Sequence, residues 1–360
     1  MVIVGAAGFE PAAFCSQNRR ANRAAPCPEF LRITKLIIFL LVKKYFRTKF
    51  VFSLYSILIF MKFSSAQLFE LCTPDCTSYA VSTVAEAYAF CRKVTLSHYE
   101  NFPVASVLFP KKIRNHIFAV YAFARIADDI SDELTDLPAE DRINALNKFE
   151  ALLSAENTSN PVFIALHKTI TENNLPLVPF QKLIHAFKMD VNFRQADSID
   201  DLLNYCHYSA NPVGEIVLRL FGQYNSTTSH LSDKICTALQ LANFWQDLSL
   251  DLAHCRYYLP HDLLNNYSLN KESLFLDENS VKLGLFLNEL FDYTQELFIE
   301  GAELIDHLRT FRLKTEIKLT LYGGMKILEK TRALGIDTIK LRPKLLFFDV
   351  ISIILKTLFG

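Results

Sequence analysis

Two short segments of the chain carry acidic side chains at helical spacing, and the first begins at Tyr121. Arg125, Asp128 and Asp132 follow it at intervals of four, three and four residues. A helix advances by about 100° per residue, so these four side chains share one narrow face. Aspartate is a poor helix former, and carboxylates four residues apart repel each other. The arrangement is therefore unfavourable unless a cation binds to it.

The second segment repeats this pattern with carboxamides as well as carboxylates. Gln240, Asn243, Asp247 and Asp251 are separated by three, four and four residues, which again places them on one face. The apolar residues between them are Leu241, Phe244, Trp245, Leu248 and Leu250. The segment thus predicts a buried helix with a single polar stripe.

A stripe of acidic residues on a helix is most often a solvated face. Two such stripes on helices that are otherwise apolar are harder to explain in that way. Carboxylate and carboxamide oxygens suit a hard cation, and Mg²⁺ in proteins takes one or two carboxylates together with phosphate oxygens of a substrate. We therefore predict that the two stripes face each other and bind Mg²⁺ and a diphosphate. The predicted metal ligands are Asp128, Asp132, Asn243, Asp247 and Asp251.

Glycine is scarce, which limits both the fold and the other kinds of site. The chain has ten glycines, and none lies between Gly8 and Gly214. Phosphate-binding loops, nucleophile elbows and dinucleotide-binding turns need glycine at fixed positions, so that stretch excludes them. Tight β-hairpins also depend on glycine-containing turns. The fold class that remains is all-α.

Apolar residues recur at the helical period from residue 80 onward, and prolines fall in the breaks between periodic segments. Pro212 is an exception, because it lies inside a periodic segment and should kink that helix. The predicted helices span residues 81–96, 112–134, 139–155, 161–174, 177–194, 200–222, 230–253, 280–308, 311–332 and 344–358.

Charge and cysteine content narrow the range of partners and compartments. Lys plus Arg and Asp plus Glu number 38 each. This balance argues against nucleic acid as a partner, because binding to a phosphate backbone leaves a basic excess. The eight cysteines show no metal-binding pattern. We interpret them as reduced thiols and expect a cytoplasmic protein.

Residues 1–60 differ in composition from the rest of the chain. Their apolar runs, at 37–42 and 50–60, are each too short to span a bilayer, and the order of charged and apolar segments does not fit a signal peptide. The beginning of the chain is similar to peptides encoded by translated non-coding DNA, so we predict that the native start is Met61. The expected organisation is an extension at 1–60 and one domain at 61–360. Peripheral contact with the inner face of the cell membrane stays an open alternative.

With these motifs the chain resembles the squalene/phytoene synthase family of head-to-head isoprenoid synthases over residues 80–353. The family's signatures are Tyr-x-x-x-Arg-x-x-Asp-Asp-x-x-Asp and Gln-x-x-Asn-x-x-x-Asp-x-x-x-Asp, the second followed by Arg-x-Tyr-x-Pro. The matching residues are Tyr121, Arg125, Asp128, Asp129, Asp132, Gln240, Asn243, Asp247, Asp251, Arg256, Tyr258 and Pro260. The resemblance implies a single-domain helical bundle with a central cavity and a Mg²⁺-dependent enzyme acting on a prenyl diphosphate.

The resemblance can be narrowed to a subgroup. Segments 98–106, 209–214 and 243–247 are similar to the bacterial hydroxysqualene synthases of hopanoid-type pathways. Relatives that condense two farnesyl diphosphates usually carry Arg at the position of Gln246 and an acidic residue at that of Leu250. Both are absent here. The resemblance therefore implies that the enzyme ionises presqualene diphosphate and captures the carbocation with water, giving hydroxysqualene and diphosphate.

Roles for individual residues follow from the same resemblance. Asp128, Asp132, Asp247 and Asp251 would act in catalysis through the metal, and Tyr205 or Gln246 would orient the attacking water. The implied substrate-binding residues are Tyr121, Arg125, Gln240, Asn243, Gln246, Arg256, Tyr258 and Phe102. For Arg256, an ion pair with a neighbouring aspartate is an equal alternative. Aromatic faces can stabilise a carbocation. The aromatic residues expected in the pocket are Phe102, Tyr205, Phe244 and Trp245.

Three alternatives stay open at this point. The first is the condensation of two identical diphosphates to squalene, dehydrosqualene or phytoene, with farnesyl diphosphate as a substrate. The second is a non-catalytic assembly factor with the same fold, although all four main aspartates are present. The third is a lipid-binding membrane protein, because residues 345–359 form an apolar helix interrupted by Asp349 and Lys356. Enzymes of the same pathway are further candidate partners.

Overall fold

Every regular element in the described part of the chain is a helix, which confirms the all-α prediction. The structure is a computed structural model that describes residues 63–97, 109–134, 136–254 and 256–359. These residues all belong to one compact unit, Lys49–Gly360. The predicted boundary at residue 60 lies outside the described residues and stays a prediction, as does the central cavity.

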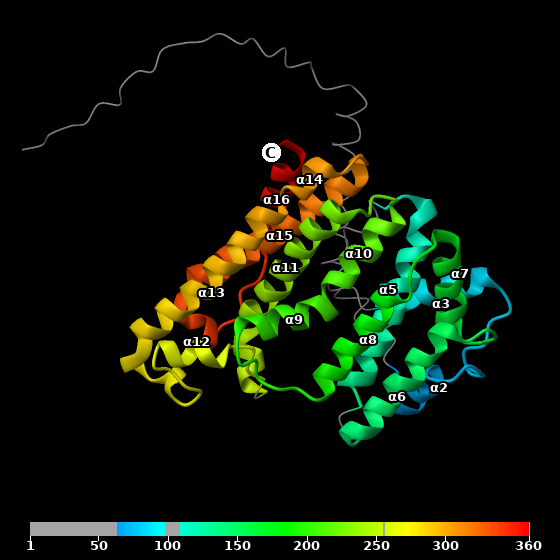
Figure 1. Ribbon diagram of the computed structural model, residues 1–360, viewed down its shortest axis with the longest axis horizontal. Helices are drawn as coiled ribbons and strands as arrows, with labels where there is room; N and C mark the ends of the chain where they lie inside the picture. Colours follow the sequence, from blue (N-terminus) through cyan, green and yellow to red (C-terminus); the bar gives the residue numbers. More distant parts are fainter. Residues whose placement is uncertain (1–62, 98–108, 135, 255, 360) are drawn as a thin grey trace, which may run out of the picture. The chain divides into compact units, whose positions relative to one another are not determined.

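The first half of the described chain is built around the helix that carries the first acidic stripe. Its elements are α2 (Ser65–Leu71), α3 (Val84–Ser97), α5 (Lys111–Asp132), α6 (Ala139–Ala151), η1 (Leu152–Ser154), α7 (Pro161–Asn173) and α8 (Val178–Val191). Phe123 of α5 is completely buried, and its ring lies 5.3 Å from that of Phe149, 6.0 Å from Phe163 and 5.6 Å from Phe180. These aromatic contacts anchor α5 on α6, α7 and α8 (Figure 1).

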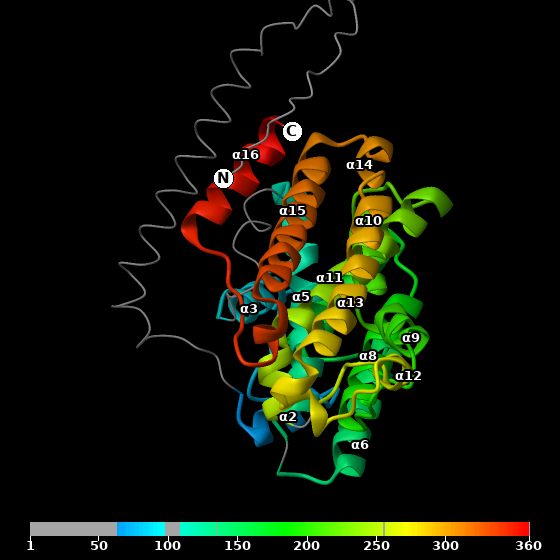
Figure 2. The ribbon, with the colours of Figure 1, turned by 90° about the vertical axis from the view of Figure 1, so that its left-hand side faces the viewer.

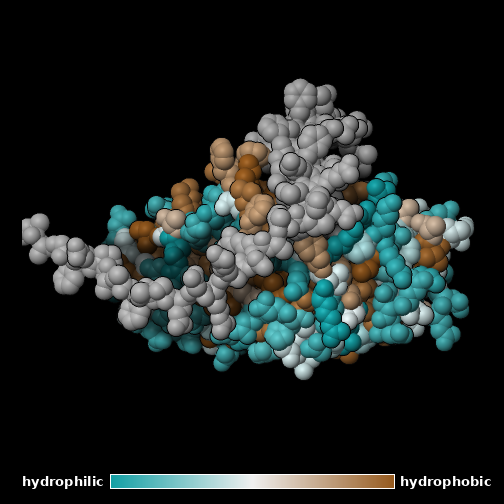
Figure 3. Space-filling model, turned by 90° about the horizontal axis from the view of Figure 1, so that it is seen from above, coloured by the Kyte–Doolittle hydropathy of each residue, from teal (hydrophilic) through white to brown (hydrophobic). Residues whose placement is uncertain are grey.

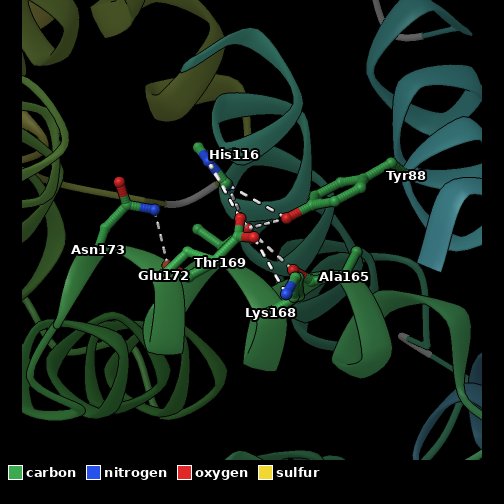
Figure 4. Close-up of polar contacts among 7 residues, drawn as sticks. All are labelled: Tyr88, His116, Ala165, Lys168, Thr169, Glu172 and Asn173. Atoms are coloured by element: carbon green, nitrogen blue, oxygen red, sulfur yellow. Dashed lines mark hydrogen bonds and ion pairs between the residues drawn. The ribbon is translucent and has the colours of Figure 1, made fainter. Parts of the chain in front are cut away.

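A buried polar network also ties three of these helices together. The Tyr88 hydroxyl on α3 lies 3.2 Å from His116 Nδ1 on α5 and 3.1 Å from Thr169 Oγ1 on α7 (Figure 4). Burial lowers the pKa of His116, although Glu172, 3.7 Å from its Nε2, opposes the change. Because each polar group has a partner, the network holds α5 in register without an unsatisfied buried group.

The second half surrounds the helix with the second acidic stripe. Its elements are α9 (Ile199–Ser209), α10 (Asn211–Leu220), α11 (Ser226–Ala253), α12 (His261–Asn266), η2 (Ser273–Phe275), η3 (Asp277–Asn279), α13 (Ser280–Gly301), α14 (Leu304–His307), α15 (Phe311–Leu334), η4 (Gly335–Ile339) and α16 (Phe347–Phe359). Figure 2 shows α11, α13 and α15 side by side. Gly324 of α15 permits this packing, because a Cβ there would lie 2.5 Å from Leu239 of α11 and 2.8 Å from Phe298 of α13.

The predicted helix positions are largely confirmed, with three differences. The segment 200–222 forms two helices rather than one kinked helix, because α9 ends at Ser209 and Pro212 lies in the first turn of α10. The segment 280–308 likewise ends at Gly301 and resumes as the short α14. The short helices α2 and α12 were not predicted, because seven and six residues are too few to show a period.

The core divides into two hydrophobic clusters that meet at α10. One cluster contains α5, the other contains α11, and Val217 and Phe221 pack against both. Each acidic stripe is therefore held by its own half of the core. Within the described residues, no helix is both long and apolar enough to cross a membrane.

Candidate active site

The first acidic stripe lies at the carboxyl end of α5. Arg125 is bonded to Asp128 Oδ2 over 3.0 Å and also to Asp129, which is buried. Tyr121 is half-buried one turn earlier, and Asp132 is exposed at the last residue of the helix. The helix thus places the predicted row of Tyr121, Arg125, Asp128 and Asp132 on one face, and Arg125 is held against its own carboxylates.

The second stripe lies in the last turns of α11 and is joined to a segment far along the chain. The Arg342 guanidinium forms a fork with both oxygens of Asp247, with Nη2 3.2 Å from Oδ2. Gln246 Nε2 donates to the Pro343 carbonyl over 2.9 Å. Residues 342 and 343 therefore cover this part of α11, and the amide group of Gln246 is committed to the backbone at its nitrogen.

Arg256 brings the two stripes together. It follows α11 in the chain, and its Nη2 lies 3.6 Å from Asp132 Oδ1 at the end of α5. Burial lowers the pKa of Arg256, but Asp132, Asp190 and Asp251 raise it by more. The guanidinium is thus surrounded by carboxylates from α5, α8 and α11, and the ion pair that was an alternative for this residue is present.

The electrostatics of the two stripes favour a bound cation. Burial raises the pKa of Asp128 to about 6, and the neighbouring Asp132 adds to the rise. Burial and the charge of Asp247 likewise raise the pKa of Asp251 to about 6. Asp132 and Asp251 also lie in the last turns of their helices, where the helix dipole disfavours negative charge. A divalent cation would compensate all three penalties.

A further carboxylate, that of Asp190, lies beside these residues in the last turn of α8. It accepts a hydrogen bond of 3.0 Å from the Tyr205 hydroxyl on α9. Burial raises the pKa of Asp190 to about 7, and Asp132 and Asp128 contribute in the same direction, while the Tyr205 bond and Arg256 act against it. Burial also raises the pKa of Tyr205 well above its usual range, so this tyrosine keeps its proton.

Aromatic rings pack together beside these polar groups. Phe244 of α11 stacks on Tyr258 with ring centroids 4.0 Å apart, and Tyr205 lies 5.8 Å from Phe244. Phe193 joins them at 5.1 Å from Tyr258. The predicted residues Tyr205, Phe244 and Tyr258 therefore form one cluster next to the Tyr205–Asp190 bond.

Trp245 touches the edge of this cluster, with its ring centroid 6.4 Å from that of Phe244, and its predicted place in the pocket stays a prediction. It is completely buried, and its indole nitrogen donates to Thr294 of α13 over 2.8 Å. Trp245 lies about 200° around α11 from Asp247, so it points to the side of the helix that packs in the core. Phe102 lies outside the described residues. Gln240 and Asn243 share the face of Asp247 on α11, and Asn243 is exposed there.

The donor set fits magnesium in type. The stripes offer carboxylate and carboxamide oxygens, which hard cations prefer, and neither stripe contains Cys or His. Among the described residues, no three acidic, His or Cys side chains are already grouped around one metal position. In proteins Mg²⁺ is usually bound by one or two carboxylates per ion, with phosphate oxygens of a substrate completing the shell.

Three residues of the site were missed by the sequence reasoning. Arg342 and Phe193 carry no local signal, because their partners are 95 and 65 residues away. Asp190 did carry one. A carboxylate in the last turn of an apolar helix opposes the helix dipole, just as Asp132 and Asp251 do.

Comparison with known proteins places these observations in a family. The model of the Squalene/phytoene synthase family matches residues 96–349. A hydroxysqualene synthase of Rhodopseudomonas palustris is 34% identical over 222 residues, which cover 61% of this chain and 75% of the relative. A phytoene synthase of Mycobacterium tuberculosis is 28% identical over 232 residues, covering 63% and 76%. The crystal structure of squalene synthase HpnC from Alicyclobacillus acidocaldarius aligns with a TM-score of 0.65 and 38% identity, covering 70% of this chain and 95% of that one.

Proposed function

The chain belongs to the squalene/phytoene synthase family, and from this premise we propose that it converts presqualene diphosphate and water into hydroxysqualene and diphosphate. Its similarity to hydroxysqualene synthases supports this choice of reaction. The observation that carries it is the hydrogen bond between Tyr205 and Asp190 beside two acidic stripes and an aromatic cluster. This grouping combines a place for diphosphate with a place for a cation and a group that can take up a proton.

In this proposal, carboxylate and carboxamide oxygens would hold Mg²⁺, and guanidinium groups contact the diphosphate. Asp128, Asp132, Asn243, Asp247 and Asp251 would hold Mg²⁺, which would supply positive charge against the negative charge that develops on the leaving diphosphate. The guanidinium groups that reach diphosphate oxygens are those of Arg125, Arg256 and Arg342. Each is paired with a carboxylate that is a proposed metal ligand, so metal binding would release Arg256 from Asp132 and Arg342 from Asp247. Arg125 would lose its bond to Asp128 but keep its bond to the buried Asp129.

The carbon–oxygen bond breaks with its electron pair on diphosphate, which leaves a cyclopropylcarbinyl cation. Phe244, Tyr258 and Tyr205 present aromatic rings to this cation and exclude bulk water from it. One water then forms the new carbon–oxygen bond, and its proton must be accepted. Asp190 is suited to this, because a carboxyl with a pKa of about 7 is a better base than an ordinary aspartate. Tyr205, which donates to Asp190, orients the water.

Gln246 has a smaller part in this proposal than in the sequence-based expectation. Its nitrogen is used to hold Pro343, so the side chain positions the segment that carries Arg342. Tyr205 is therefore the preferred residue for orienting the water.

The experiment that tests the reaction compares two substrates. Purified protein is incubated with Mg²⁺ and either presqualene diphosphate or farnesyl diphosphate, without reduced nicotinamide, and diphosphate release is measured. We expect rapid release from presqualene diphosphate only. Release from farnesyl diphosphate with formation of presqualene diphosphate would instead assign the chain to the condensing members. Release from neither substrate would favour the non-catalytic alternative.

A further inference from the structure

The outer face of α16 exposes large apolar side chains in a regular row. Phe348 is 80% exposed, Leu355 44% and Phe359 69%. They are separated by seven and four residues, so they lie on one side of the helix, with Ser352 between them. Large apolar side chains are normally buried when a protein folds. A contiguous row of them at the surface therefore marks an interaction surface.

The two charged residues of α16 do not interrupt this row. Asp349 is bonded to Lys330 of α15 over 2.7 Å and accepts a second bond from the Leu346 amide. Lys356 extends over the ring of Tyr322, also on α15, at 4.5 Å. Both charges thus fasten α16 to α15, and Figure 2 shows the two helices side by side. The outward face that remains carries no acidic group.

The neighbouring surface is apolar and basic. Leu341 is 53% exposed and Leu346 63%, in the segment that leads into α16. Lys340, Lys344 and Lys356 are exposed along the same stretch. Asp349, already paired, is the sole acidic residue from 340 to 359 in the sequence. Figure 3 views the molecule from the side on which Figure 1 places α16, and hydrophobic atoms gather at the surface there.

Two exposed apolar residues on another helix provide a comparison with the row on α16. Val281 and Leu285 on α13 are 76% and 55% exposed. The same face continues with Asn288 and Asp292, both exposed, so the apolar character ends after one turn. Along α16 the apolar character returns after Ser352, with Leu355 and Phe359 exposed on the same face.

We propose that α16 and the segment leading into it dock the protein on a lipid bilayer with anionic headgroups. The helix has 13 residues, about 20 Å in length, which is too short to span a hydrocarbon core of about 30 Å. It lies in the plane of the interface, with Phe348, Leu355 and Phe359 among the acyl chains and Lys340 and Lys344 at the headgroups. This inference does not depend on the proposed reaction, although an enzyme that releases a C30 isoprenoid would benefit from a nearby apolar phase.

The test is co-sedimentation of the full chain with vesicles of phosphatidylcholine alone and of phosphatidylcholine mixed with an equal amount of phosphatidylglycerol. We expect binding to the mixed vesicles that weakens as salt is added. Phe348→Ser combined with Phe359→Ser should reduce the partition coefficient about tenfold or more. The matched control, Val281→Ser combined with Leu285→Ser, should bind as the unchanged protein does. Circular dichroism and thermal melting establish that both variants are folded.

Two results would overturn the proposal. If the Phe348/Phe359 variant binds vesicles as well as the unchanged protein, another part of the chain makes the membrane contact. If the full chain fails to bind vesicles but forms a dimer that the same variant abolishes in light scattering, the face is an interface between two copies. Failure of the substrate experiment described above would leave either outcome unaffected, because vesicle binding is measured without substrate.

Discussion

Asp128→Asn should make the protein more stable and nearly inactive, because this carboxylate serves the site at the expense of the fold. Burial and Asp132 raise the pKa of Asp128 from 3.8 to about 6. Each pKa unit corresponds to about 1.4 kcal/mol, so the ionised carboxylate would cost about 3 kcal/mol if it were fully buried. Its side chain is 38% exposed, and solvent screening reduces the cost to about 1 kcal/mol. The attraction of Arg125 is already included in this shift.

The pH dependence follows from the direction of this shift. The folded-state pKa lies above the unfolded value, so the cost is absent below pH 3.8, grows as pH rises, and is complete above about pH 6. In EDTA at pH 8, Asp128→Asn should therefore raise the melting temperature by about 2 °C, and the gain should shrink as pH falls toward 4. Asp306→Asn, at an exposed position on α14, is the control and should change little.

The same variant should lose most turnover. Removing one charged ligand from a site that stabilises a leaving group typically costs about 10²-fold or more in kcat. Magnesium with inorganic pyrophosphate should stabilise the unchanged protein against heat more than it stabilises Asp128→Asn. Differential scanning fluorimetry measures this stabilisation for both proteins. If Asp128→Asn were less stable than the unchanged protein at pH 8 in EDTA, this would refute the reasoning that the ionised Asp128 destabilises the fold when no cation is bound.

Glu316→Gln should stabilise the protein at alkaline pH by up to about 3 kcal/mol in denaturant titrations. Burial raises the pKa of Glu316 from 4.5 to about 7, so the carboxyl loses its proton at a lower pH in the unfolded state than in the folded state. The gain in stability should vanish near pH 4.5, and a gain independent of pH would contradict this explanation. Asp190→Asn keeps an acceptor for Tyr205 but cannot take up a proton, so kcat should fall about 10²-fold or more with little change in KM; unchanged kcat would exclude it as the base. Gly324→Val should destabilise the protein by about 2 kcal/mol, because its side chain would meet Leu239 and Phe298, and an unaltered melting temperature would show that α15 can shift.

The helices were predictable from the sequence because their signals are local. The apolar period, the prolines and the scarcity of glycine locate nearly every long helix, and the spacing of Asp128 with Asp132 and of Asp247 with Asp251 defines both stripes. The two stripes are predicted from the sequence to face each other, but the sequence does not show how α5 and α11 are positioned, since each packs into its own hydrophobic cluster. The Arg256–Asp132 contact depends on that arrangement.

Two adjacent aromatic residues on α11 show a second limit of the sequence analysis. Phe244 and Trp245 are adjacent and both aromatic, so composition favours the pocket for each equally. Their rings touch edge to face at 6.4 Å, but Phe244 stacks on Tyr258 while the Trp245 indole nitrogen donates to Thr294 of α13 in the core. Arg342 could not be found at all, because its pairing with Asp247 closes a loop of 95 residues. Asp190 could have been found by asking which carboxylates oppose a helix dipole.

The most direct test of the account is the origin of the oxygen in the product. The protein is incubated with presqualene diphosphate and Mg²⁺ in ¹⁸O-labelled water without reduced nicotinamide, and the organic extract is analysed by mass spectrometry. The proposed reaction forms a new carbon–oxygen bond with solvent, so the account predicts hydroxysqualene that carries the label. A hydrocarbon product, or an alcohol without the label, would contradict it.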